Sequence, residues 1–162
     1  MKYRMWLFVS LITACNRPAD DVHEAKKRLL TADRWYLEQI AMDEVPVLKE
    51  GKHIPHISGV RFDRHMDWVQ FHADGSFEGH MTGDDTTQHY QWKVYVPQKV
   101  IALRDSATGT GGWNIYPRNV YEDTFTMETR STVYDPPRVT KVTLGFKIVD
   151  SGRWTVDNYF LP

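Results

Sequence analysis

The sequence predicts an all-β protein, an antiparallel up-and-down barrel of about eight or nine short strands that follow a short helix. Three observations lead to this fold class. Apolar and polar residues alternate along most segments after residue 34, so each strand presents one face to a core. Turn signals recur about every 8 to 12 residues. The chain of 162 residues, 13% of them aromatic, is long enough to bury one core. A closed barrel is favoured over a sandwich because closure removes exposed strand edges.

The hairpin at residues 67–81 illustrates how side-chain parity predicts strand register. Asp74-Gly75 is a strong turn signal, but a two-residue loop there would place Phe71 opposite Glu78 and mix apolar with polar groups. A three-residue loop, 73–75, collects most apolar groups on one face. Its register pairs Phe71 with Phe77, Val69 with Gly79 and Asp67 with Met81. We therefore predict the three-residue loop, with Gly75 in the left-handed conformation. The outward face would carry His72, Glu78 and His80.

The other elements follow from the same patterns, taken in chain order. A helix is predicted from Asp21 to near Thr31, with Asp20 or Asp21 as its cap. The long segment 42–64 is predicted to be an irregular loop, because it contains two prolines and two glycines. The predicted strands span residues 34–41, 67–72, 76–81, 87–96, 99–104, 112–116, 120–132, 139–149 and 153–158, with a second three-residue turn at 150–152.

The first fourteen residues have the features of a targeting segment. Lys2 and Arg4 precede an apolar run at 5–14, which is shorter than the roughly 20 residues that a membrane-spanning helix needs. The run ends in Leu11-Ile-Thr-Ala-Cys15, which resembles the lipobox of bacterial lipoproteins. An ordinary secretory signal is the alternative. Cys15 is the only cysteine of the chain, so it has no intramolecular disulfide partner.

The lipobox resemblance implies an organisation for the whole chain. Residues 1–14 would be a lipoprotein signal peptide, 15–21 a tether beginning at a lipidated Cys15, and 22–162 a single domain. Multiple acyl chains on Cys15 would give durable membrane anchoring. The next residue, Asn16, does not match the pattern that retains some lipoproteins at the inner membrane. The expected location is therefore the bacterial outer membrane, in a leaflet that the sequence does not specify.

Composition and motifs argue against several classes of function. The formal net charge is -1 and no basic run follows the signal segment, so nucleic acid is not expected as a partner. The His53/His56 pair is interrupted by Pro55, and nearby carboxylates lack metal-site spacing, so no metal or other cofactor is predicted. The chain contains no Gly-x-Ser-x-Gly nucleophile motif and no His-Glu-x-x-His zinc motif. We predict no catalytic residues and no enzymatic activity.

Several strand motifs resemble the lipocalin-like domain of small bacterial lipoproteins. They are Trp35 after a short helix, the hairpin Phe71-His-Ala-Asp-Gly-Ser-Phe77, the strand Tyr90-Gln-Trp-Lys-Val94, and then Val100-Ile-Ala-Leu103 and Phe125-Thr-Met127. The likeness covers roughly residues 28–149. One departure is Asp33, which stands where lipocalins carry a glycine. The resemblance implies a cup-shaped barrel that binds small apolar molecules without catalysis.

Two functions from different classes follow from these features. The first is a membrane-anchored binding protein that holds a small apolar or amphipathic ligand in the barrel, beneath residues 42–65. Aromatic residues on inward faces would line its cavity: Trp35, Phe71, Phe77, Tyr90, Trp92, Phe125 and Phe146. The alternative is an interaction or envelope-assembly module with a filled barrel, in which Trp68, Tyr95 or Tyr116 contacts a protein partner. An open interior favours the first function and a filled interior the second.

Overall fold

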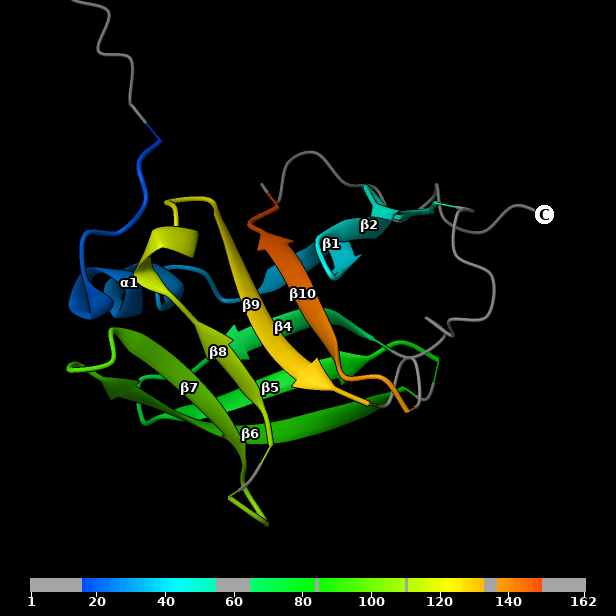
Figure 1. Ribbon diagram of the computed structural model, residues 1–162. Helices are drawn as coiled ribbons and strands as arrows, with labels where there is room; N and C mark the ends of the chain where they lie inside the picture. Colours follow the sequence, from blue (N-terminus) through cyan, green and yellow to red (C-terminus); the bar gives the residue numbers. More distant parts are fainter. Residues whose placement is uncertain (1–15, 55–64, 84, 110, 133–136, 150–162) are drawn as a thin grey trace, which may run out of the picture.

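The computed structural model describes residues 16–54, 65–83, 85–109, 111–132 and 137–149, which form an antiparallel β-barrel with a helix at one end (Figure 1). Eight strands follow one another around the barrel, and the last pairs with the first. They are β1 (Trp35–Met42), β4 (Met66–Phe71), β5 (Ser76–Met81), β6 (Thr86–Tyr95), β7 (Val100–Asp105), β8 (Trp113–Ile115), β9 (Thr124–Ser131) and β10 (Thr140–Lys147). This closed, up-and-down antiparallel barrel confirms the predicted fold class.

Helix α1 (Val22–Leu29) forms for the reasons that its sequence predicts. The side chain of Asp21 accepts hydrogen bonds from the backbone N–H groups of His23 and Glu24, each at 2.8 Å, and so caps the first turn. Val22, Ala25 and Leu29 are buried on one face of the helix. That face packs at the end of the barrel where β6 and β7 meet, beside the short 3-10 helix η1 (Pro117–Asn119).

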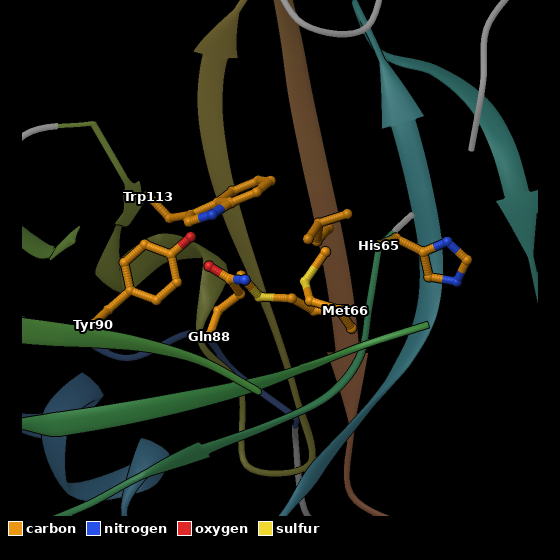
Figure 2. A pocket seen from close by; sticks show the side chains of 7 residues that line it. His65, Met66, Gln88, Tyr90 and Trp113 are labelled. Carbon is orange, nitrogen blue, oxygen red and sulfur yellow. The ribbon is translucent and has the colours of Figure 1, made fainter. Parts of the chain in front are cut away.

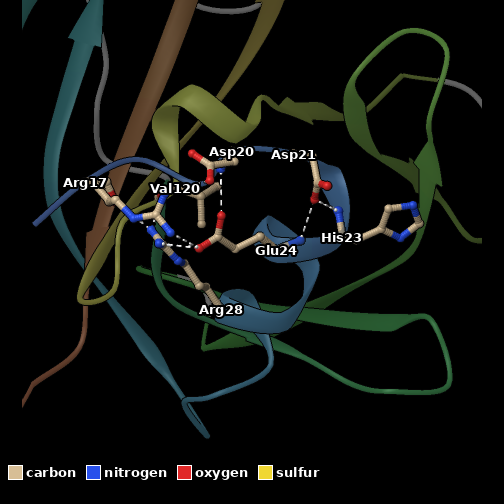
Figure 3. A network of polar contacts seen from close by, with 7 residues as sticks. All are labelled: Arg17, Asp20, Asp21, His23, Glu24, Arg28 and Val120. Carbon is tan, nitrogen blue, oxygen red and sulfur yellow. Dashed lines mark hydrogen bonds and ion pairs between the residues drawn. The ribbon is translucent and has the colours of Figure 1, made fainter.

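The segment that precedes α1, predicted as a tether, is packed against the domain (Figure 3). The backbone N–H of the buried Ala19 donates to the carbonyl oxygen of Val120 at 2.7 Å. Arg28, only 8% exposed, donates from one guanidinium nitrogen to the carbonyl oxygens of Arg17 and Val120, at 2.7 and 3.2 Å. At its far end, Asn16 donates to the carboxylate of Asp123 at 3.0 Å. Residues 16–21 therefore belong to the folded surface.

The hairpin of β4 and β5 has the predicted three-residue loop. Phe71 pairs with Phe77 and Val69 with Gly79, and Gly75 has a φ of 93°. One predicted pair is wrong, because a bulge between Met66 and Trp68 makes Met66, in place of Asp67, the partner of Met81. The second predicted turn, at 150–152, and the strand after it lie outside the described residues.

The prediction of an irregular loop over 42–64 is wrong for its first half. Residues there form the strands β2 (Val45–Lys49) and β3 (Lys52–His53), which extend the sheet from β1. The turn between β1 and β2 consists of Asp43 and Glu44, both at positive φ, a conformation usually signalled by Asn or Gly. Pro46 lies in β2 beside a register shift, where a missing N–H is tolerated. Residues 55–64 of the predicted loop lie outside the described residues.

The two strands change how β1 closes the barrel. The first residues of β1, Trp35 and Tyr36, pair with β4, whereas residues 39–42 pair with β2 on the same edge. The β1–β4 contact is therefore confined to the end of the barrel that carries α1. At the other end β4 diverges from β1, which places the beginning of β4 at the rim of an open mouth.

Two glycines before β8 allow the cost of a left-handed backbone conformation to be separated from the cost of steric overlap. Gly109 and Gly112 both have positive φ, 68° and 98°, but an added Cβ has open space only at Gly109. At Gly112 it would overlap the carbonyl oxygen of Leu103 on the neighbouring strand. We expect Gly109→Ala to lower the free energy of unfolding by about 1 kcal/mol, the cost of left-handed backbone. Gly112→Ala should lower it by at least about 2 kcal/mol more, from overpacking. Urea unfolding of both variants measures the difference, and equal losses would contradict it.

Candidate ligand pocket at the open end of the barrel

Aromatic side chains fill the end of the barrel beneath α1. The ring of Trp35 is fully buried and meets Phe125 edge-on, with centroids 5.1 Å apart. Phe125 in turn stacks on Phe146 at 5.1 Å and lies 5.6 Å from Phe71. The Trp35 indole N–H donates to the carbonyl oxygen of Leu29 at 3.1 Å, which joins the C-terminal end of α1 to the core. This end of the barrel is packed.

Trp92 closes the same end from the side of β6. Its indole N–H donates to the carbonyl oxygens of His72 and Ser76, at 3.1 and 3.0 Å, across the turn between β4 and β5. The ammonium group of Lys26, on α1, lies 5.4 Å from the centroid of the Trp92 ring. The polar parts of Trp92 are thereby satisfied, so this residue joins the helix, the turn and the strand.

A pocket of about 260 Å³ opens at the opposite end of the barrel. Its lining comes from the ends of β4, β5, β6, β8 and β10, and consists of His65, Met66, Met81, Gln88, Tyr90, Trp113 and Leu144. The methionines and Leu144 supply an apolar wall. Figure 2 shows the amide of Gln88 and the phenol oxygen of Tyr90 turned toward the indole of Trp113, whereas His65 lies apart from them. The pocket therefore combines apolar side chains with polar groups at two places, the corner formed by Gln88, Tyr90 and Trp113 and the separate ring of His65.

Tyr90 is the titratable group at this polar corner. Burial raises the pKa of its phenol above the ordinary value, and the negative charge of Asp105, its neighbour across the β6–β7 ladder, raises it further. A hydrogen bond with the side chain of Trp113 acts in the opposite direction on the pKa. Tyr90 is consequently a neutral phenol near pH 7. It can exchange hydrogen bonds with a ligand and places no charge in the pocket.

The structure separates the seven aromatic residues that were predicted to line a cavity. Tyr90 lies in the wall of the open-end pocket. Phe125 and Phe146 border a second pocket of about 220 Å³, together with polar residues of β1, β9 and the η1 region. Four others line neither pocket and pack in the core: Trp35, Phe71, Phe77 and Trp92. Cys15, the predicted lipidation site, lies outside the described residues.

Sequence reasoning missed six of the seven residues that line the open-end pocket. The signal for some of them was present, because alternation places Trp113 and Leu144 on inward faces. Alternation along a strand assigns each side chain to the inner or the outer face of the barrel, but it does not show which end of the barrel a helix fills. That choice depends on the docking of α1, which is a tertiary contact.

The aromatic residues considered as contacts for a protein partner differ in accessibility. Trp68 lies between the ring of His80, stacked at 5.3 Å, and the guanidinium of Arg34, 4.2 Å from its centroid. Tyr116 is partly covered by Arg118, whose guanidinium carbon is 4.5 Å from the ring centroid. Tyr95 is 42% exposed. Of the three, Tyr95 alone presents a largely open ring.

His80 forms a polar clamp on the outer face of the open end. Its Nδ1 lies 2.8 Å from a carboxylate oxygen of Asp67, and its Nε2 lies 2.9 Å from one of Asp85. These contacts connect β4 to the turn between β5 and β6 and use both ring nitrogens. Within the described residues, no group of three or more potential ligands could hold a metal ion. None of the described helices is long and apolar enough to span a membrane.

Comparisons with known proteins add one distant structural likeness. The bovine lipocalin allergen Bos d 2 is similar to this chain over 75% of its length and 73% of the allergen, with 16% identity and a TM-score of 0.43. No protein-family model and no curated protein sequence matches the chain. The assignment of the fold therefore rests on the strand order and the β10–β1 closure.

The clamp predicts a pH-dependent stability. Hydrogen bonds to Asp85 and Asp67 raise the pKa of His80 above its ordinary 6.5, since only the imidazolium can donate from both nitrogens. A raised folded-state pKa stabilises the protein fully below pH 6.5, and this stabilisation is lost as pH rises through the folded-state pKa. His80→Phe keeps a ring against Trp68 but removes the titrating group. The free energy of unfolding that this variant loses relative to wild type should therefore be largest at pH 6 and decrease toward pH 9. Chemical unfolding across that range measures the loss.

The partner carboxylate offers the control. Asp85→Asn should lower the pKa of His80, measured by the NMR titration of its ring protons, because it removes the largest cause of the raised value. An unchanged pKa in this variant would contradict the clamp.

Proposed function

We propose that this protein binds one small amphipathic molecule in the open-end pocket. The observation that supports the proposal is the mixed lining, in which polar groups of Tyr90, Trp113, Gln88 and His65 lie with the apolar side chains of Met66, Met81 and Leu144. Binding sites for small molecules have this composition, in which apolar surface supplies affinity and a few polar groups orient the ligand. The packed core beneath α1 supports the same function, because it limits the depth that a ligand can reach.

The dimensions and chemistry of the pocket define the ligand class. Its volume of about 260 Å³ lies just below the usual range for ligand pockets, which begins at about 300 Å³. The ligand is therefore a compact aryl or short-chain compound. It carries one group that exchanges hydrogen bonds with Tyr90 and Trp113. The polar groups that described residues place at the pocket are those of Tyr90, Trp113, Gln88 and His65, and we propose that they orient a ligand without catalysis.

We further propose that the protein is anchored to the bacterial outer membrane through acyl chains on Cys15. The lipobox-like sequence at 11–15 and the absence of another cysteine support this location. The leaflet is not part of the proposal.

If a ligand binds in the open-end pocket, a larger side chain in that pocket should lower the affinity, whereas the same side chain elsewhere on the barrel should not. The neutral probe N-phenyl-1-naphthylamine should show saturable fluorescence enhancement with the mature chain. Met81→Trp places a large ring at the pocket wall and should weaken binding at least about tenfold, or 1.4 kcal/mol. Thr143→Trp, on the outer face of β10 next to Leu144, is the matched control and should bind as wild type does. Absence of saturable binding, or equal loss in both variants, would overturn the proposed function.

The proposed anchor predicts a specific modification. When the full chain is expressed in a diderm bacterium, the mass of the mature protein should equal that of residues 15–162 plus the acyl groups. Cys15→Ser should abolish the added mass and release the protein from membranes. Asn16→Asp should keep the modification and shift the protein toward the inner membrane. An unmodified Cys15 in the wild-type mature chain would sink the anchoring proposal.

A further inference from the structure

We propose that the helix-capped end of the barrel lies against the bilayer and that the turn between β6 and β7 contacts the lipid headgroups. This inference rests on the proposed lipid attachment at Cys15. The partner is the surface of the membrane that holds the anchor, and the opposite end of the barrel, with the pocket mouth, then faces the aqueous phase.

The docked N-terminal segment supports this orientation. Asn16 is fixed by its hydrogen bond to Asp123, and Ala19 by its bond to Val120. Arg28 holds the carbonyl of Arg17 between these two points. Consecutive Cα atoms are about 3.8 Å apart, so the lipid attachment is within one residue of Asn16. The short connection between the anchor and the domain limits how far the barrel can turn away from the membrane.

The anchored position and α1 belong to the same end of the barrel. η1 and the loop that follows it precede β9, whose first residues pair with the last residues of β10. α1 contacts η1 as well as β6 and β7. In Figure 1 the chain before α1, the helix and the β6–β7 turn all lie on the left of the barrel. The residues that line the pocket come from the other strand ends.

The β6–β7 turn has the chemistry of a membrane-contacting loop. Tyr95 and Val96 are 42% and 51% exposed, with the exposed Lys93 and Lys99 on either side. Tyrosine is favoured at membrane interfaces because its ring is apolar and its hydroxyl group is wet. Lysines beside it attract anionic headgroups. The exposed Lys27 of α1 extends the positive charge.

Two carboxylates at this end are ion-paired with arginines, whereas those of Asp33, Asp74 and Glu122 are exposed. The carboxylate of Glu24 lies 2.7 Å from Arg28, and that of Asp20 lies 2.6 Å from Arg17. Asp21 caps α1 and Asp123 accepts from Asn16. Within the β6–β7 turn itself, between residues 93 and 99, the two charged side chains are Lys93 and Lys99, and both are positive. Two exposed apolar residues, Val45 and Val139, lie at the opposite end and serve as the matched control.

Hydrogen–deuterium exchange can test the orientation without relying on lipidation in cells. The mature chain, residues 15–162, is coupled through its single cysteine to a maleimide lipid in phosphatidylethanolamine–phosphatidylglycerol vesicles. The reference is the same chain coupled to a water-soluble maleimide. We expect amides at 94–99 to exchange at least about threefold more slowly on vesicles. The turns at 43–44 and 105–109, at the open end, should be unchanged.

A paired substitution links the protection to the proposed contact. The double variant Tyr95→Ser/Val96→Ser should lose the slowed exchange at 94–99, whereas Val139→Ser should keep it. Protection at the open end, or none at the β6–β7 turn of the wild type, would overturn the orientation. Because the coupling is chemical, that result would leave the cellular acylation of Cys15 standing. An unmodified Cys15 in cells would instead remove the anchor.

Discussion

Trp35 is the side chain on which the arrangement of this barrel depends. Its indole N–H is bonded to Leu29 at the C-terminal end of α1, its ring meets Phe125, and it begins the strand that closes the sheet. Removing a buried aromatic side chain of this kind typically costs about 3–5 kcal/mol, a large part of the stability of a domain this size. One residue therefore links the helix, the aromatic core and the closure of the barrel.

The packed end determines where a ligand can bind. Trp35, Phe71 and Phe125 pack one end of the barrel, and the open-end pocket lies where β4 has diverged from β1. Methionine suits the wall of this pocket because its unbranched side chain adapts to different shapes. The same asymmetry separates the pocket from the N-terminal segment, so a protein anchored at Cys15 could bind a ligand at one end and its membrane at the other.

Polar contacts connect strands and turns at the open end of the barrel. The His80 clamp connects the beginning of β4 to the β5–β6 turn. On the other side of the mouth, the carboxylate of Asp43 accepts from Arg138 and from the backbone N–H of Lys141, which joins the β1–β2 turn to the beginning of β10. Such contacts are weaker than buried apolar surface and respond to pH and salt. The proposed binding site thus lies in the half of the barrel whose strands and turns these contacts connect.

The sequence by itself determined the fold class, the capped helix and the register of the β4–β5 hairpin, because these depend on local alternation and turn chemistry. The inward faces of Phe71, Trp92 and Phe146 follow from the same period of two. It could not predict the β2–β3 strands, since the turn at Asp43-Glu44 lacks the residues that usually adopt positive φ. Only the tertiary structure decided which end α1 fills, and hence that Tyr90 lines a pocket while Trp35 packs in the core. Parity describes a face of the sheet, whereas the height of a residue along the barrel depends on contacts between distant segments.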